Sequence, residues 1–155
     1  RVLKDSDNSG FVVYLTISGR ENRYAKYLFN KYGSIDNIKF IGEQSRAAVF
    51  EYYERTDCLI FPSKLETWGL PISEFKRFNK PILMADAEYA AETVGTYDKV
   101  KYFDPDDHLQ LAGQMKMAMD HRLEYDVNRA KAVDPPYAGD WCGLFDILLD
   151  SELWV

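Results

Sequence analysis

Two glutamates, Glu66 and Glu74, stand eight positions apart on either side of a turn that contains Gly69 and Pro71. An ionised carboxylate only accepts hydrogen bonds and has two oxygens, so each glutamate can hold a pair of neighbouring hydroxyl groups. Sugars and riboses present such pairs. On spacing alone, a plainer interpretation leaves Glu66 in solvent and Glu74 on an exposed helix face, because acidic residues are mostly exposed.

The turn between these glutamates joins a strand to a helix. The apolar run 57–61 ends at Pro62-Ser63, which is typical of a strand buried on both faces. From Leu70 the apolar residues follow helical spacing, and Lys80-Pro81 ends the helix. In a parallel sheet such a helix points unpaired amides outward, where an anion such as a phosphate can bind. Gly69 lets the backbone approach that anion closely.

The same stretch resembles a known family motif. The segment 62–74 reads P-S-K-L-E-T-W-G-L-P-I-S-E. It resembles the E-x7-E segment of retaining GT-B glycosyltransferases of the group 1 type (glycosyltransferase family 4), commonly P-S-x-x-E-x-F-G-L-P-x-x-E. Trp68 stands where that family usually has Phe. Three further stretches, 38–42, 80–83 and 102–107, resemble the family's V-x-F-x-G, G-K-P-V-I and L-F-D-P-D-D segments in the same order.

The resemblance runs from about Phe11 to about Asp150 and implies roles for individual residues. It makes Glu66 the catalytic candidate, in contact with donor-sugar hydroxyls near the reacting carbon, as nucleophile or as positioning group. It implies that Glu74 holds the ribose diol of the donor. The resemblance implies that the amides of Trp68, Gly69 and Leu70 face the diphosphate and that Gln44, just after Gly42, lies near the base through its backbone. The remaining donor-binding candidates are thus Thr67, Trp68, Gly69, Leu70, Gly42 and Gln44.

The resemblance also implies a function. We expect residues 1–155 to form a single Rossmann-like donor-binding domain, one half of a two-domain GT-B hexosyltransferase-like enzyme whose acceptor domain is absent. The reaction transfers a sugar from a nucleotide-diphosphate sugar to an acceptor hydroxyl with retention, without cofactor or metal, and bacterial polysaccharide synthesis is the family-level context. We expect the isolated fragment to be inactive.

Two alternatives come from other classes of protein. A non-catalytic nucleotide- or nucleotide-sugar-binding or docking module would keep the Glu74 site but tolerate loss of Glu66. A flavodoxin-like or receiver-type regulator shares the alternation of strands and helices. The chain has neither an acidic cluster at the end of a first strand nor a flavin phosphate loop, which argues against the regulator.

Composition limits the partners and the compartment. The chain has 155 residues, enough for one domain, and a net charge of −6, which argues against a nucleic-acid partner. Two cysteines are too few for a disulfide framework, so a reducing cytoplasm fits. The sequence contains no membrane-length apolar stretch and no recognisable signal peptide. We expect the protein in the cytoplasm, meeting the inner face of a membrane only indirectly.

Strand and helix patterns alternate, which predicts an α/β fold: a doubly wound, mostly parallel sheet with helices on both faces. After the last of these strands and helices we expect a polar helix over 123–133 and an apolar helix over about 139–149. The apolar helix either docks on another domain or packs locally. The expected strands are 11–17, 38–41, 58–61, 81–85 and 100–103. The expected helices are 24–32, one that starts at Ser45 and includes Tyr53, 70–79, 87–94 and about 104–120.

One strand of the family's domain has no counterpart in this sequence. That domain normally opens with a strand and a loop carrying Arg and Lys, which neutralise the donor's diphosphate. Arg20 and Lys26 resemble this pair, but too few residues separate Lys26 from Gly42 for the helix and strand that should intervene, so we interpret the match as coincidence. We expect the incomplete sheet either to pair 12–17 directly with 58–61, or to borrow a strand from another copy in a homodimer.

Overall fold

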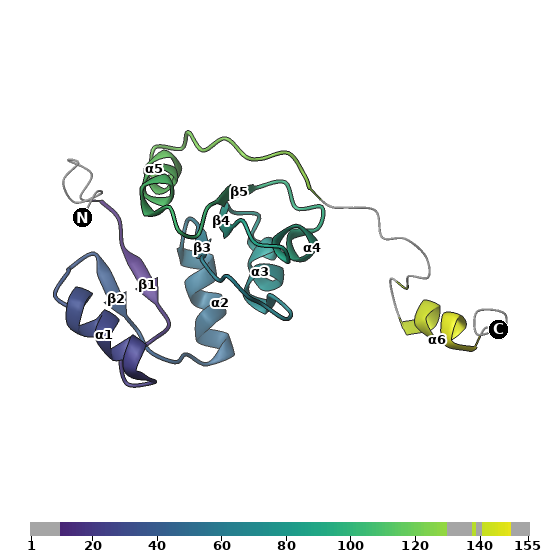
Figure 1. Ribbon diagram of the computed structural model, residues 1–155, viewed down its shortest axis with the longest axis horizontal. Coiled ribbons are helices and arrows are strands. Elements are labelled where there is room, and N and C mark those ends of the chain that lie inside the picture. The colour runs from purple at the N-terminus through teal and green to yellow at the C-terminus, as the bar shows by residue number, and fades with distance from the viewer. Residues whose placement is uncertain (1–9, 130–137, 139–140, 150–155) are drawn as a thin grey trace.

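The computed structural model describes residues 10–129, 138 and 141–149, and in these residues strands and helices alternate along the chain (Figure 1). All paired strands are parallel, which confirms the α/β prediction. The strands are β1 (Val13–Leu15), β2 (Ile38–Phe40), β3 (Leu59–Phe61), β4 (Ile82–Ala85) and β5 (Val100–Phe103). The helices are α1 (Arg23–Tyr32), α2 (Arg46–Arg55), α3 (Leu70–Phe75) with the 3-10 turn η1 (Lys76–Phe78), α4 (Ala90–Val94), α5 (His108–Met119) and α6 (Trp141–Leu149).

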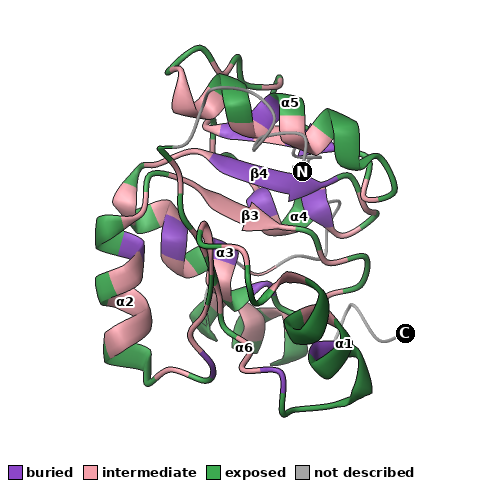
Figure 2. Ribbon diagram, turned by 90° about the vertical axis from the view of Figure 1, so that its left-hand side faces the viewer, coloured by how far each residue is buried: buried purple, intermediate pink, exposed green. Residues whose placement is uncertain are grey.

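The core is built around β4, whose four side chains are all fully buried. Because successive side chains on a strand point to opposite faces, β4 serves two layers at once. Ile82 and Met84 pack with buried residues of α2, α3 and α4, whereas Leu83 and Ala85 pack with the apolar side of α5. Figure 2 shows β4 between α5 on one side and α3 with α2 on the other. This arrangement confirms the prediction of a Rossmann-like sheet covered on both faces.

The strands form two separate sheets in the described residues, ordered β1-β2 and β3-β4-β5. The expected direct pairing of 12–17 with 58–61 is therefore wrong. One physical reason is a contact on the neighbouring helix: Tyr52 of α2 packs against Tyr14 of β1, with ring centroids 5.0 Å apart, so β1 is held against α2 instead of against β3. The other expectation, a strand borrowed from another copy, stays a prediction.

Helix starts follow local sequence signals closely. The side chain of Ser45 accepts a hydrogen bond from Ala48 N, as expected for the N-cap of α2, and Asn22 caps α1 in the same way. The helix expected from about residue 104 begins later, because Asp107 is its N-cap and accepts from the amides of Leu109 and Gln110. The helix expected over 87–94 is shortened to α4, and Gly95 ends it with a positive φ of 59°.

The expected polar helix over 123–133 is wrong for residues 123–129, which are not helical, and residues 130–133 lie outside the described residues. The reason is a competing set of hydrogen bonds to the edge of β5. Asp126 donates its backbone N–H to Val100 O (2.9 Å), and its carboxylate accepts from Tyr102 N (2.8 Å). These bonds hold the segment extended beside the strand.

The expected terminal helix is present as α6, with residues 139–140 outside the described residues. None of its described residues is buried, and Trp141 and Phe145 remain 74% and 55% exposed. Local packing of this helix is therefore not found, and its docking on another domain stays a prediction. The two cysteines differ in environment: Cys142 on α6 is exposed, whereas burial raises the pKa of the Cys58 thiol beside β3 to about 12.

Lys80 stabilises the junction between α2 and β4. Its ammonium group donates to three backbone carbonyls at the end of α2, those of Tyr53 (3.0 Å), Glu54 (2.5 Å) and Thr56 (2.8 Å). The last carbonyls of a helix have no partner within the helix, and a cation near them is favoured by the helix dipole.

We predict that Lys80→Met lowers the free energy of unfolding by about 1.5–3 kcal/mol, the range for hydrogen bonds to a charged group. Lys26→Met, at an exposed position on α1, is the control and should change stability little. Chemical denaturation of both variants measures the difference. Equal stabilities would contradict the role assigned to Lys80.

Candidate functional site

The motif loop, defined as residues 62–69, connects β3 to α3 and is anchored on both sides. Tyr89, at the start of α4, donates its hydroxyl to Ser63 O (2.7 Å). On the other side, Lys64 forms an ion pair with Asp106 in the loop that follows β5. The carboxyl ends of parallel strands meet at one edge of a sheet, so these anchors join neighbouring loops of the same edge.

The loop ends at Gly69, where a side chain could not fit. Gly69 has a positive φ of 59°, and a Cβ atom built there would lie 2.3 Å from Cγ2 of Thr93 on α4. Both the backbone conformation and the close approach therefore require glycine. Pro71 in the first turn then fixes the start of α3, and Ile72 donates its N–H to Gly69 O (2.9 Å).

Glu66 binds its own loop. Its Oε1 atom accepts hydrogen bonds from the backbone N–H groups of Thr67 (2.8 Å) and Trp68 (3.4 Å). These two bonds lower the pKa of the Glu66 carboxyl, because they stabilise its ionised form. The amide groups of this turn thus converge on a negatively charged oxygen, which is the electrostatic arrangement expected for an anion site.

Glu74 has a different partner. Its carboxylate forms an ion pair with Arg46 of α2 at 3.2 Å, and its side chain is only 19% exposed, against 76% for Arg46. Its negative charge adds to burial in raising the pKa of the neighbouring Tyr53 to about 12. Glu74 is therefore a half-buried, paired carboxylate and not the fully exposed one of the plainer interpretation.

Gly42 and Gln44 lie beyond the end of β2. Gly42 is buried with a positive φ of 70°, and its N–H donates to Ile17 O (3.2 Å). The side-chain amide of Gln44 donates to Ile41 O (2.6 Å), so this side chain is held against its own segment. Arg46 lies two residues after Gln44 and forms the ion pair with Glu74. This ion pair therefore joins the segment that follows β2, in one sheet, to α3, which follows β3 in the other sheet.

The structure thus groups the predicted residues in two ways. Residues 66–70 form one continuous turn, and the Arg46–Glu74 ion pair links residues 42–46 to the first turns of α3. Trp68 and Leu70 are exposed, at 79% and 63%. The two glutamates have separate partners, and whether they face one hollow stays a prediction.

Two charged residues near this site were not among the sequence-based candidates. The position of Arg46 could have drawn attention in the sequence. A cation in the first turn of a helix is disfavoured by the helix dipole, so its presence there indicates a compensating partner. Glu21 accepts from the amides of Ser18 (2.6 Å) and Gly19 (3.0 Å) after β1, and these bonds lower the pKa of its carboxyl to about 2. Its role depends on loop geometry, which the sequence does not display.

Comparison with known families decides the class of the protein. A family model described as glycosyl transferases group 1 matches residues 2–133, which is most of the chain. The chain belongs to this family. Its members transfer sugars, so this group 1 glycosyltransferase chain is of the transferase class. No curated protein sequence matches it.

The described residues contain neither a metal-ion cluster nor a membrane-spanning helix. In residues 10–129, 138 and 141–149, no group of three or more His, Cys, Asp or Glu side chains is arranged to hold a metal ion. Within the same part of this glycosyltransferase chain, no helix combines the length and apolarity needed to cross a bilayer.

We predict that Gly69→Ala lowers the free energy of unfolding. The strained backbone alone costs about 1–3 kcal/mol, and the clash with Thr93 adds to this cost. Gly69→Ala combined with Thr93→Ser removes the clashing methyl group and should recover only part of the loss. Gly113→Ala is the control: apart from its chain neighbours and the backbone of its own helix, no described atom lies within 4 Å of the added Cβ, and in the interior of α5 the change should be neutral or stabilising. A harmless Gly69→Ala, measured by thermal unfolding, would refute the description of this turn.

A second prediction concerns pH. Since the folded-state pKa of Glu66 lies below the ordinary value of 4.5, its bonds to the loop persist above that value and are lost as the pH falls through the lowered pKa. The amide resonances of Thr67 and Trp68, followed by NMR, should titrate with a midpoint below 4.5. Glu66→Gln should abolish this titration. A midpoint at or above 4.5 would show that the carboxylate does not bind these amides in solution.

Proposed function

We propose that this chain is the donor-binding half of a retaining, GT-B-type glycosyltransferase that moves a sugar from a nucleotide-diphosphate donor to an acceptor hydroxyl. The observation that carries the proposal is the motif loop, in which two consecutive amides converge on a carboxylate oxygen at the end of β3. A diphosphate oxygen carries the same charge and accepts the same hydrogen bonds. The family assignment supports sugar transfer as the chemistry.

In this proposal the donor exchanges places with Glu66. The diphosphate takes the amides of the motif loop, and the released Glu66 carboxylate turns to hydroxyls of the donor sugar near the reacting carbon. Positive charge develops on the sugar ring and negative charge on the leaving diphosphate as the bond between them breaks. A carboxylate beside the ring and amides beside the diphosphate stabilise both charges.

Glu74 holds the ribose diol in this proposal, and Arg46 acts as a positioning residue for it. The ion pair fixes one side of the carboxylate and leaves a second oxygen for hydroxyl groups. Gly42 and Gln44 lie at the same end of the domain and contact the base through their backbone. In this proposal the parts of a nucleotide sugar lie in order along one edge of the fold.

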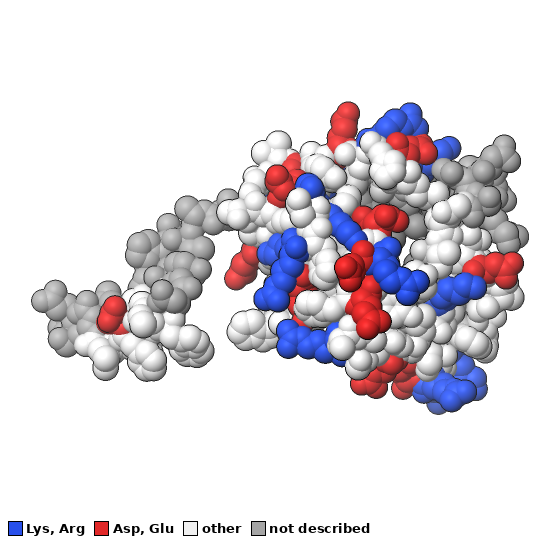
Figure 3. All heavy atoms as spheres, turned by 180° about the vertical axis from the view of Figure 1, so that it is seen from behind, with Lys and Arg blue, Asp and Glu red and all other residues white. Residues whose placement is uncertain are grey.

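The biological setting extends this proposal. We place the reaction in the cytoplasm, at the inner face of a membrane in the intact protein, as a step of bacterial polysaccharide synthesis that uses neither cofactor nor metal. A separate domain supplies the acceptor site, and a strand from a second copy joins β1 to β3. We propose no nucleic-acid partner. On the face drawn in Figure 3, acidic and basic side chains are interspersed, whereas a nucleic-acid site needs clustered Lys and Arg.

Calorimetric titration of the chain with UDP, GDP and their sugars tests donor binding. We expect weak binding to the isolated chain, because half of the site comes from elsewhere, and no measurable transfer. Glu74→Ala should weaken binding further, and Glu92→Ala, at an exposed position on α4, is the matched control. Measurable turnover by this chain alone would disprove the proposed division of labour.

The non-catalytic alternative has some support of its own, because both glutamates already have partners within the protein. The two functions differ in their need for Glu66. In an intact protein that carries this chain, Glu66→Ala should reduce transfer by about a hundredfold or more if Glu66 stabilises the transition state. Unchanged transfer with intact nucleotide binding would favour the docking or binding module.

A further inference from the structure

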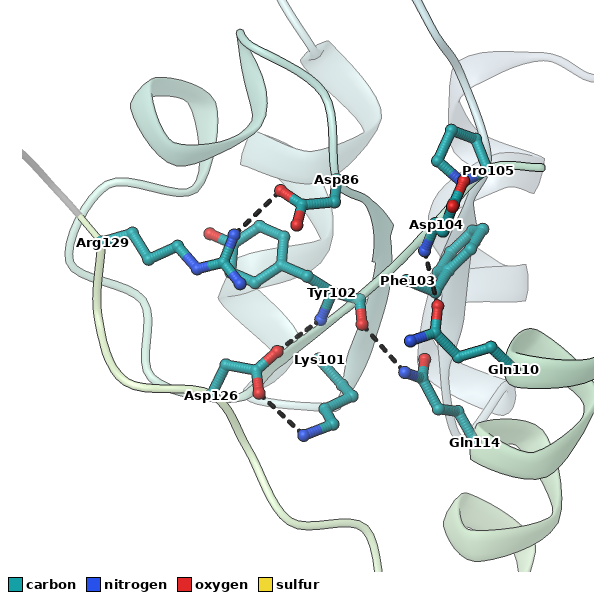
Figure 4. Close-up of a pocket in the computed structure, with 10 residues that line it drawn as sticks. All are labelled: Asp86, Lys101, Tyr102, Phe103, Asp104, Pro105, Gln110, Gln114, Asp126 and Arg129. Carbon is teal, nitrogen blue, oxygen red and sulfur yellow. Dashed lines mark hydrogen bonds and ion pairs between the residues drawn. The ribbon is translucent and has the colours of Figure 1, made fainter. Parts of the chain in front are cut away.

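A hollow lies at the outer edge of the three-stranded sheet, where β5 has no neighbouring strand among the described residues. It has a volume of about 580 Å³, within the range of small-molecule sites, and is formed by β5, the first turns of α5 and the segment 126–129 (Figure 4). Asp86, at the carboxyl end of β4, and Asp104, at that of β5, stand at its upper rim in that view. Its lining includes part of the stretch 102–107, whose resemblance to a family segment assigned no ligand to it.

Side chains take the place of a neighbouring strand along this edge of β5. The backbone N–H of Tyr102 donates to Asp126, and its carbonyl accepts from Nε2 of Gln114 (both 2.8 Å). The backbone N–H of Asp104 donates to Oε1 of Gln110 (2.6 Å). The bonds of Tyr102 hold the strand, the segment 126–129 and Gln114 in place before any ligand arrives, whereas Gln110 is an exposed side chain that can turn.

One wall carries a buried polar atom without a partner. Gln114 is only 3% exposed, and its Oε1 atom has no hydrogen-bond partner among the described residues. Turning the amide over would not help, because its Nε2 group would then leave the carbonyl of Tyr102. A buried acceptor without a donor costs free energy, and such atoms in folded proteins call for an explanation.

The neighbouring amide supplies the complementary group. Gln110 stands four residues before Gln114 on α5 and therefore on the same face of the helix. Its Oε1 is bonded to the strand, which leaves its Nε2 group with N–H donors at the hollow. A group inserted between the two amides must accept from Gln110 and donate to Gln114. A hydroxyl group does both, whereas a phosphate oxygen only accepts and an ammonium group only donates.

The charges at the hollow also disfavour an anion. Arg129 is paired with Asp86 (2.8 Å), and Lys101 is paired with Asp126 (2.7 Å). Both cations are thereby neutralised, and Asp104 adds a further negative charge. The guanidinium of Arg129 also lies 4.1 Å from the ring centre of Tyr102, which holds it in place.

We infer that this hollow binds a neutral, hydroxyl-rich ligand, a sugar ring, at a site separate from the motif loop. One ligand hydroxyl bridges the amides of Gln110 and Gln114 after the exposed Gln110 side chain turns to admit it, and Asp104 accepts from another. The hollow opens at the same edge of the sheet as the motif loop, and the Lys64–Asp106 ion pair joins the two regions. The inference does not depend on the donor site.

NMR titration with methyl α-glucoside tests it. The side-chain amide signals of Gln110 and Gln114 and the backbone signal of Tyr102 should shift and saturate. Gln114→Met should weaken binding at least about fivefold, the effect of losing a typical hydrogen bond. Gln110→Met, at an exposed position, should do the same without endangering the fold, and Asn30→Met on α1 is the matched control.

Several results would overturn the inference. They are the absence of saturable shifts, which leaves water as the partner of Gln114; equal binding by the wild type and Gln110→Met; and stronger binding of inorganic phosphate than of the glucoside. Adding UDP should leave the glucoside shifts unchanged. Competition by UDP would place the sugar at the donor site, and would thus refute a separate site without touching the proposed transfer.

Discussion

The burial of β4 on both faces is the constraint on which the rest of the structure depends. A strand with apolar side chains on each face needs a layer of helices on each side, and the chain supplies α5 on one side and α2, α3 and α4 on the other. Parallel pairing with β3 and β5 then places three carboxyl ends at one edge. The motif loop, Asp86 and Asp104 all follow from that edge, so both the proposed donor site and the sugar hollow depend on the same packing.

Much of this could be predicted because the signals are local. Ser45 caps a helix by accepting from an amide three residues away, and Gly69 is required where the backbone turns left-handed beside α4. The motif around Glu66 and Glu74 likewise occupies one stretch of chain. Each feature involves neighbours in sequence, so the pattern of residue types is sufficient to locate it.

The features that could not be predicted involve residues distant in sequence or the conformation of a loop. The separation of β1 from β3 depends on Tyr14 meeting Tyr52, and residues 123–129 stay extended because Asp126 bonds to β5. These two long-range contacts override what the local residue pattern favours, which is direct pairing of β1 with β3 and a helix over 123–129. The sequence gives no sign that Glu66 turns back on its own amides, or that Arg46 crosses to Glu74, because side-chain direction depends on the folded loop.

The contrast between the two thiols has a practical consequence. Thiol reagents attack the thiolate, which Cys58 hardly forms at neutral pH, whereas Cys142 is exposed on α6. A maleimide dye or spin label would therefore attach selectively to this helix without any engineered substitution. Such a label would report directly whether α6, with its exposed Trp141, packs on another surface when the domain proposed above to supply the acceptor site is added.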